Sequence, residues 1–538
     1  MDISRPAQET QAVRKISFIE FILINTGLTI GFGTMVFVPL AASITGPSVL
    51  LALFLAFIVS LVVVMSMAEI ATIFPYSGGP IYSVRYGLPP GAANIVLMLI
   101  LLPMLSLILG SGGTESLSFA YYLRSLIPAL AILGPHANAI IACLLVVVVC
   151  VINIIGVKIF SRTQFYILAF MFVALIIWGA LSIPHTQMEL YQQPFFKPGI
   201  TPLLFVEAVG LAYWAFVGTE LGGTLAGEVK YPLTTLRKGF LISVMLVFLV
   251  NAWVIGISLG LAPVKELAVA FEAGKGPVAE VTRAVGAVAF AMIALAAAVG
   301  MHPSTINANL SETGRTLYAT GKEGVIPKWF GRLNSKFKTP VNALIFVAIL
   351  FCAVIAPNLA NYLGAGACIM SLVLYIALMM SIIMLKKRRP NIERPFKVHM
   401  VLPILAIVFS AILAVGLTYY IGTEVAKPPP EGLGVSLVMG EIISVGIGLL
   451  FAIFGIVLYF ATRKTMKAPP PFEEFREKIM KVEDDETIPE EEWTELRAPM
   501  RATGEALKKI NRQYRIMLAI CLSLVAITAA FTAYIYFT

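Results

Sequence analysis

The sequence predicts a helical protein that crosses a membrane many times. Of its 538 residues, 59% are hydrophobic and 13% are charged, whereas soluble domains are about 45–50% apolar and about 25% charged. Apolar runs of roughly 20 residues recur along the chain, and this is the length that a helix needs to cross a hydrocarbon core of about 30 Å. Barrel strands would be about 10 residues long and would alternate in polarity. The predicted fold class is therefore all-α and polytopic, and a soluble or disordered chain is excluded.

The chain divides into an apolar core and a charged C-terminal part. We expect residues 1–16 to form a polar N-terminal segment, 17–462 to hold twelve spans, 463–515 to form a charged linker and 516–538 to add a thirteenth span. The expected spans are 17–44, 48–74, 91–123, 137–157, 164–184, 202–227, 239–262, 284–314, 340–357, 361–385, 400–421, 437–461 and 516–536.

Lysine and arginine are distributed unevenly between the two sides of these spans. Segments on the side of the N-terminus hold 33 of the 39 basic residues, and segments on the other side hold six. Basic residues collect on the cytoplasmic side of membrane proteins, which predicts a multi-pass cell-membrane protein with a cytoplasmic N-terminus. With thirteen spans the C-terminus is then extracellular. The same bias accounts for the net charge of +9 without nucleic acid as a partner.

The linker 463–515 differs in composition from the spans on either side of it. It contains Ala468-Pro-Pro-Pro471 and carries 12 acidic and 12 basic residues, and its last part, 501–515, has a helical pattern. Such a mixture is typical of a partly ordered surface segment. We expect the linker to be cytoplasmic, where it docks a protein partner, docks the chain's own inner gate, or only tethers the last span.

The sequence offers no pattern for a metal or a cofactor. Its five cysteines all fall in apolar runs and form no CxxC pair, so no disulfide framework or zinc site is predicted. HExxH and the phosphate-binding pattern GxxxxGK[ST] do not occur either, which argues against a membrane-embedded hydrolase and against ATP-driven transport by this chain. We therefore expect no cofactor.

Two spans, the first and the sixth, are interrupted by glycines at mid-membrane depth. Gly31 and Gly33 interrupt the first span, and Gly218 and Gly222 interrupt the sixth. An unwound helix frees backbone N–H and C=O groups, which membranes tolerate only where these groups line a cavity or meet a ligand. Two broken spans, five apart in order, are typical of transporters built from an inverted repeat. The alternative is that these glycines only permit close helix packing.

Ionisable residues within spans are costly and mark candidate functional positions. Glu220 follows the break in span six, and we expect it to act as a gate or a pH-linked acid. Glu115 in span three is either a substrate-binding or a packing carboxylate, and His302 in span eight is either a proton relay or a hydrogen-bonded packing residue. The acids that we expect to be interfacial or paired are Glu20, Glu69, Glu207 and Glu228.

Aromatic residues flank both breaks. Phe32 lies between two glycines of the first span, and Trp214 and Phe216 precede the break in the sixth. Aromatic faces stack on apolar or cationic groups of ligands, although they also serve as packing. Their position beside the breaks makes them candidates for substrate contact.

Several motifs occur in the order found in one superfamily of transporters. Over about residues 15–462 the chain resembles the amino acid–polyamine–organocation (APC) transporters, and the order Trp-x-Phe-x-Gly-x-Glu at 214–220 is most similar to their arginine/agmatine antiporter members. The matching stretches are Ser66-Met-Ala-Glu69 with Phe74-Pro-Tyr-Ser-Gly-Gly-Pro80, Gly218-Thr-Glu220, Ala226-Gly-Glu-Val-Lys-Tyr-Pro232, Gly314 to Pro327, Lys338-Thr-Pro-Val-Asn-Ala343 and Asn153-Ile-Ile-Gly-Val-Lys158.

The resemblance implies a leucine-transporter-type fold. In it, spans one to five and six to ten form an inverted repeat, two further spans act as a scaffold, and the thirteenth span is an addition. The resemblance also implies a permease or exchanger, not an enzyme, which moves an amino acid or organic amine by alternating access and holds it between the two breaks.

The resemblance further assigns roles to individual residues. Gly31, Phe32 and Gly33 would lie on the side of a substrate carboxylate, and Trp214 would be an aromatic gate. The candidate substrate-binding residues are Gly31, Phe32, Gly33, Thr34, Glu115, Trp214, Phe216 and Gly218; the candidate gating or pH-linked residues are Glu220 and His302; and the candidate ion site is Ser304 and Thr305.

The chain departs from the superfamily in two places. The family usually has Gly-small-Gly in span one, whereas the middle residue here is Phe32, which argues against recognition of a standard α-amino acid and favours an amine. Some proton-coupled members place a lysine inside span five, whereas 165–177 carries no charge here. The alternative function is a transporter-like membrane sensor or partner-docking protein that moves no substrate.

Overall fold

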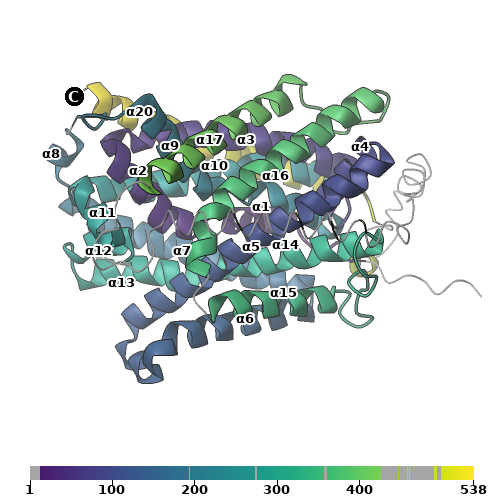
Figure 1. The fold of residues 1–538 in the computed structure, drawn as a ribbon, viewed down its shortest axis with the longest axis horizontal. Helices are drawn as coiled ribbons and strands as arrows, with labels where there is room; N and C mark the ends of the chain where they lie inside the picture. The colour runs from purple at the N-terminus through teal and green to yellow at the C-terminus, as the bar shows by residue number, and fades with distance from the viewer. Residues whose placement is uncertain are drawn as a thin grey trace, which may run out of the picture.

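Long helices lie side by side and run along the length of the molecule (Figure 1). The computed structural model describes residues 12–192, 194–272, 275–356, 360–425 and 498–537, with the stretch 490–493 and the single positions 446, 453, 457 and 460. Within these residues the regular elements are helical, and eight of the helices are long and apolar enough to cross a membrane. The predicted all-α, multi-pass membrane fold is therefore confirmed.

The first five predicted spans appear as helices, and the first of them is interrupted. It consists of α1 (Phe18–Gly27), an unwound stretch, the π-helical turn η1 (Gly33–Phe37) and α2 (Val38–Thr45). Spans two to five are α3 (Val49–Ile73), α5 (Pro90–Leu126), α6 (Ala137–Ile155) and α7 (Val157–Ser182), with the short α4 (Gly79–Gly87) after α3.

The sixth span is interrupted as well. It consists of α9 (Pro202–Tyr213), the 3-10 turn η5 (Trp214–Phe216) and the 3-10 segment η6 (Thr219–Glu228). The later spans are α10 (Pro232–Leu261), then α13 (Ala287–Leu295) with η7 (Ala296–Met301) and α14 (His302–Lys322), then α15 (Val341–Ile355), α16 (Ala360–Arg388) and α17 (Val401–Val425). The predicted twelfth span, 437–461, lies outside the described residues apart from single positions.

Span eight contains a third interruption, which the sequence analysis did not expect. The π-helical turn η7 widens the helix just before His302 and Pro303. Proline has no backbone N–H and its ring clashes with the carbonyl of the preceding turn, so an α-helix cannot continue undisturbed through it. Pro303 therefore sets the point at which α14 begins and at which His302 is presented.

Buried ion pairs between basic side chains and glutamates lie at one end of the bundle, which we call the basic end. There Arg85 contacts Glu323 (2.8 Å), and Arg315 contacts Glu228 (2.6 Å). Lys386 (2.8 Å) and Arg394 (3.1 Å) both contact Glu69. The short α4 lies toward this end, and the short α8 (Met188–Tyr191), α11 (Val264–Glu272) and α12 (Pro277–Arg283) lie toward the opposite one (Figure 1).

The last helix, α20 (Gly504–Phe537), runs from the basic end to the opposite end beside α10. At the basic end Lys238 donates to Asn511. At the opposite end the Phe531 ring packs on Tyr191 at 5.4 Å between centroids. The helix begins at Gly504, inside the segment expected to be linker, because the basic stretch before the apolar run has high helix propensity and continues the same helix.

The described part of the linker packs on the basic end of its own core. The backbone N–H of Arg14 donates to the Trp493 carbonyl (3.0 Å), and the Trp493 ring packs edge-on against Tyr231 (5.3 Å). Glu490 forms an ion pair with Lys230. The described residues of this segment thus contact Arg14, Lys230 and Tyr231 of the same chain.

Candidate functional site

The two helix breaks meet at the centre of the bundle. A Cβ added to Gly33 would lie 2.8 Å from Ala215 Cα, and one added to Gly218 would lie 3.0 Å from Leu28 Cγ. Gly218 also has φ +115°, a conformation that residues with a side chain rarely adopt. The sequence left two interpretations of these glycines, helix breaks or close helix packing. In the structure the glycines serve both purposes.

The protein's own Glu115 carboxylate caps the first break. The backbone N–H of Phe32 donates to Glu115 Oε1 (2.8 Å), and a Cβ on Gly31 would overlap the same carboxylate. The other oxygen, Oε2, lies 2.5 Å from His302 Nδ1. An N–H group freed by an unwound helix needs an acceptor, and a carboxylate is the strongest one at the positive end of a helix. A buried acid from α5 therefore occupies the position that the resemblance assigned to a substrate carboxylate.

His302 completes this first cluster. Its ring stacks on Tyr122 at 5.5 Å between centroids with an interplanar angle of 18°. Its second nitrogen, Nε2, is buried and has no hydrogen-bond partner among the described residues. The contact between Glu115 and His302 therefore joins α5 to α14 beside the first break.

A second carboxylate caps the second break in the same way. The backbone N–H of Gly218 donates to both oxygens of Glu220 at 3.1 Å each. The phenol of Tyr375 on α16 donates to Glu220 Oε1, and the Tyr213 ring packs edge-on against Tyr375 at 6.3 Å. Sequence reasoning missed Tyr375, because a single tyrosine in an apolar span belongs to no recognisable motif.

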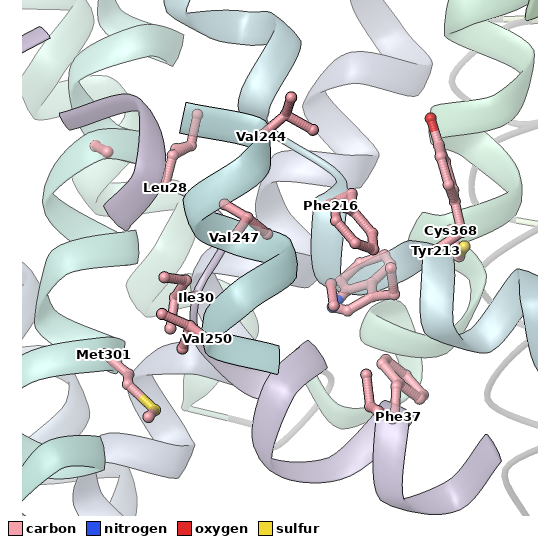
Figure 2. Close-up of a cluster of buried hydrophobic side chains, with 14 of the residues drawn as sticks. Leu28, Ile30, Phe37, Tyr213, Phe216, Val244, Val247, Val250, Met301 and Cys368 are labelled. Carbon is pink, nitrogen blue, oxygen red and sulfur yellow. The ribbon is translucent and has the colours of Figure 1, made fainter. Parts of the chain in front are cut away.

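Apolar and aromatic side chains pack around the two helix breaks. Phe37 packs edge-on against both Phe32 (5.2 Å) and Trp214 (5.5 Å). Figure 2 shows Phe37 and Phe216 on one side of this region and Leu28 and Ile30 of the first break on the other. Leu28 and Ile30 lie beside α10, whose residues here are Val244, Val247 and Val250. Such a lining lowers the local dielectric constant and strengthens every charge interaction within it.

The candidate ion residues form a hydrogen-bonded brace at the first break. The hydroxyl of Ser304 donates to the Gly27 carbonyl (2.9 Å), and that of Thr305 contacts the carbonyls of Gly27 (3.1 Å) and Ile30 (3.2 Å). Gln164 Nε2 donates to Ser304 Oγ (2.6 Å). Both hydroxyls therefore face the carbonyl of Gly27, and Thr305 also faces that of Ile30.

Two amide side chains near the first break were not among the residues predicted from the sequence, and one predicted residue, Thr34, has a hydroxyl without a partner among the described residues. Asn307 Nδ2 donates to Gln164 Oε1 (2.8 Å), so two amides that the sequence analysis did not single out hold the brace in place. Thr34 is buried, and its hydroxyl has no hydrogen-bond partner within the part of the chain that the structure describes. The structure thus gathers the candidate residues at two points. Gly31, Phe32, Gly33, Glu115, His302, Ser304 and Thr305 lie at or against the first break, and Trp214, Phe216, Gly218 and Glu220 lie at the second.

The chain is similar to known transporters over most of its length. Residues 16–462 match the sequence model of a family described as amino acid permease. The chain is 24% identical over 438 residues to a branched-chain amino acid permease of Bacillus subtilis (strain 168), covering 77% of this chain and 90% of that protein. It is 22% identical over 429 residues to a methylthioribose transporter of the same organism, with 76% and 89% covered. It is 23% identical over 364 residues to the vacuolar cationic amino acid transporter 4 of Arabidopsis thaliana, with 64% and 58% covered. The chain therefore belongs to the amino acid permease family of the APC superfamily, whose members are transporters and not enzymes.

Proposed function

We propose that the protein is a secondary transporter that carries a small organic amine across the cell membrane by alternating access. One observation supports this substrate class most directly. One N–H donor at each break, that of Phe32 and that of Gly218, is already bound by the carboxylate of Glu115 or Glu220. A substrate carboxylate would have to displace a buried acid and face its negative charge, whereas an ammonium group would be attracted by both acids.

The rest of the lining suits the same ligand. Phe32, Phe37 and Trp214 present aromatic surface beside the two carboxylates. Aromatic faces attract cations and also pack on alkyl chains. A primary amine with a short apolar body combines the two groups that this lining accommodates.

An amino acid is the second candidate, and the family match favours it. The matching family and the branched-chain relative carry amino acids in their names, although the methylthioribose relative does not. For an amino acid to bind as a zwitterion, Glu115 would have to release Phe32 N–H and turn to His302 alone. The two substrate classes therefore differ in whether Glu115 keeps its hydrogen bond to the Phe32 N–H when the substrate binds.

Alternating access requires a closed barrier that can open, and the basic end supplies one. Arg14 donates to the carbonyls of Pro75 (2.9 Å) and Ala226 (2.8 Å), and Arg315 binds Glu228. Because basic residues collect on the cytoplasmic side, we place this barrier at the cytoplasm. We further propose a five-plus-five inverted repeat, which pairs the breaks of α1 and α9.

In this proposed orientation the C-terminus lies outside the cell. The helix α20 ends beside Tyr191, at the opposite end of the bundle from Arg315. A C-terminal tag is therefore expected to react with a membrane-impermeant reagent in intact cells. A tag that reacts only after permeabilisation would contradict this orientation.

Thermal stabilisation of the purified protein tests the substrate class. The ligands are matched pairs that differ only in the carboxylate: isopentylamine with leucine, and agmatine with arginine. A ligand that binds the folded state stabilises it by about 2.7 kcal/mol at 100 times its Kd, so at least one amine is expected to raise the unfolding midpoint more than its amino acid. Stabilisation by the amino acids alone would show that the second candidate is right.

A further inference from the structure

Glu312 is a buried carboxylate with no hydrogen-bond partner on either oxygen among the residues that the structure describes. It lies on α14, and the residue is 1% exposed. An ionised carboxylate that is left unpaired at such a depth costs several kcal/mol, so a group in this position is held as the neutral acid. None of the roles assigned above to residues of the two helix breaks explains why a carboxyl group is buried at position 312.

Glu312 lies between the helix breaks and the barrier at the basic end. On α14, Thr305 contacts the first break through the Ile30 carbonyl, and Glu312 follows seven residues later on the same helix face. Three residues further on, Arg315 binds both oxygens of Glu228 at 2.8 and 2.6 Å. A group at Glu312 is thus placed to respond to the barrier on one side and to the substrate region on the other.

The charges that act on Glu312 are those of Glu220 on η6 and Arg315 on its own helix. The elements η7, α6 and α15, which pack on α14, contain no acidic or basic residue. The acidic and basic residues of the other elements packed on α14 are Glu20 of α1, Arg85 of α4, Glu115 and Arg124 of α5, Lys158 and Arg162 of α7, and Glu220 and Glu228 of η6. In the closed arrangement Arg315 is committed to Glu228 and does not bond Glu312.

We propose that Glu312 carries the coupling proton of this permease, an inference that rests on the transport function proposed above. While Arg315 is held by Glu228, the Glu312 carboxyl keeps its proton. When the barrier opens, Arg315 leaves Glu228 and turns to Glu312, one helical turn away on the same face. The O–H bond of the carboxyl then breaks, the proton passes to water at the basic end, and the carboxylate pairs with Arg315. Closure returns Arg315 to Glu228, and Glu312 then binds a proton that enters from the opposite end of the bundle by way of the substrate region.

A proton fits this position better than a metal ion. Hard cations take several oxygen ligands at once, and the described residues contain no group of three or more His, Cys, Asp or Glu side chains suited to a metal. The Arg315 guanidinium three residues away also repels a second fixed cation.

Exchange and gradient-driven uptake in proteoliposomes separate this inference from the proposed function. One unit of pH difference corresponds to about 1.4 kcal/mol, or about tenfold accumulation per coupled proton at clamped membrane potential. The wild-type protein is expected to accumulate labelled isopentylamine or agmatine about tenfold. Glu312→Gln, which mimics the neutral acid, is expected to exchange labelled for unlabelled amine yet to accumulate none.

The matched control is Glu280→Gln, which is expected to accumulate amine like the wild type. Glu280 lies near the opposite end, and its partners Lys275 and Arg283 are exposed. Accumulation by Glu312→Gln equal to that of the wild type, or accumulation driven by sodium in place of protons, would overturn the inference. Absence of exchange in the wild-type protein would contradict the proposed function.

A spectroscopic measurement tests the same inference without transport. The infrared difference spectrum between low and high pH is expected to contain a protonated-carboxyl band that Glu280→Gln keeps and Glu312→Gln loses. An unchanged spectrum in Glu312→Gln would show that Glu312 does not exchange a proton, whatever the transport activity. If Glu312→Gln loses this band and the wild-type protein shows no transport, the result would contradict the transport proposal but not the proton exchange at Glu312.

Discussion

Glu115→Gln is expected to reduce amine uptake at low substrate concentration by at least about 30-fold. In the structure one Glu115 oxygen accepts the Phe32 N–H and the other contacts His302, and the residue is 3% exposed. Glutamine keeps one acceptor for the N–H but removes the negative charge that attracts an ammonium group. Truncating one partner of a buried charged pair costs about 2–5 kcal/mol, and each 1.4 kcal/mol is a factor of ten. Initial rates of labelled amine uptake over a range of concentrations measure the loss.

Glu266→Gln is the matched control for this variant, because Glu266 lies exposed on α11. It is expected to transport like the wild type. Should Glu115→Gln also keep its uptake rate to within a factor of three, Glu115 would have only a structural role at the first break.

Arg315→Met is expected to cause the largest loss of stability among single substitutions at the basic end. Arg315 is 2% exposed and binds Glu228 through two parallel hydrogen bonds. Removing one partner of a buried ion pair leaves the other charge uncompensated and costs about 3–5 kcal/mol. The unfolding midpoint of the detergent-purified protein, followed by size-exclusion chromatography after heating, measures this loss.

The double variant Arg315→Met/Glu228→Leu separates an ion-pair effect from a packing effect. Replacing both partners by apolar residues is often neutral, so the double variant is expected to recover much of the lost stability. Arg283→Met is the surface control, because the Arg283 side chain is 49% exposed beside Glu280, and such pairs contribute about 0–1 kcal/mol. A midpoint for Arg315→Met as high as that of Arg283→Met would contradict the assigned role of the pair.

The helix breaks of spans one and six could be predicted from the sequence, because they depend on local composition. Gly31, Gly33 and Gly218 lie at mid-span, where glycine permits unwinding, and Gly218 has a positive φ, which glycine adopts most readily. The break in span eight was missed, although Pro303 provides a local signal for it. The helical pattern of 501–515 indicated a helix that leads into the last apolar run, and α20 does begin there, at Gly504.

The partners of the buried polar groups could not be predicted, because they join residues that are far apart in the sequence. Glu115 and His302 are separated by 187 positions, and Tyr375 and Glu220 by 155. One sequence shows that each of these residues is costly in a membrane, but it does not show which of them neutralise each other. Glu312 was missed although it lies within the expected span 284–314 and meets the same criterion as Glu115 and Glu220. That neither of its oxygens has a partner within the described structure could be learned only from the fold.

Uptake by proteoliposomes without ATP tests the central claim most directly. Purified protein is reconstituted at equal pH on both sides and preloaded with unlabelled isopentylamine, and entry of the labelled amine is followed with and without excess leucine outside. The account predicts saturable entry of the amine that leucine inhibits only weakly and that Glu115→Gln nearly abolishes. Binding of the amine without entry would contradict the transport proposal, and entry of labelled leucine in preference to the amine would contradict the proposed substrate class.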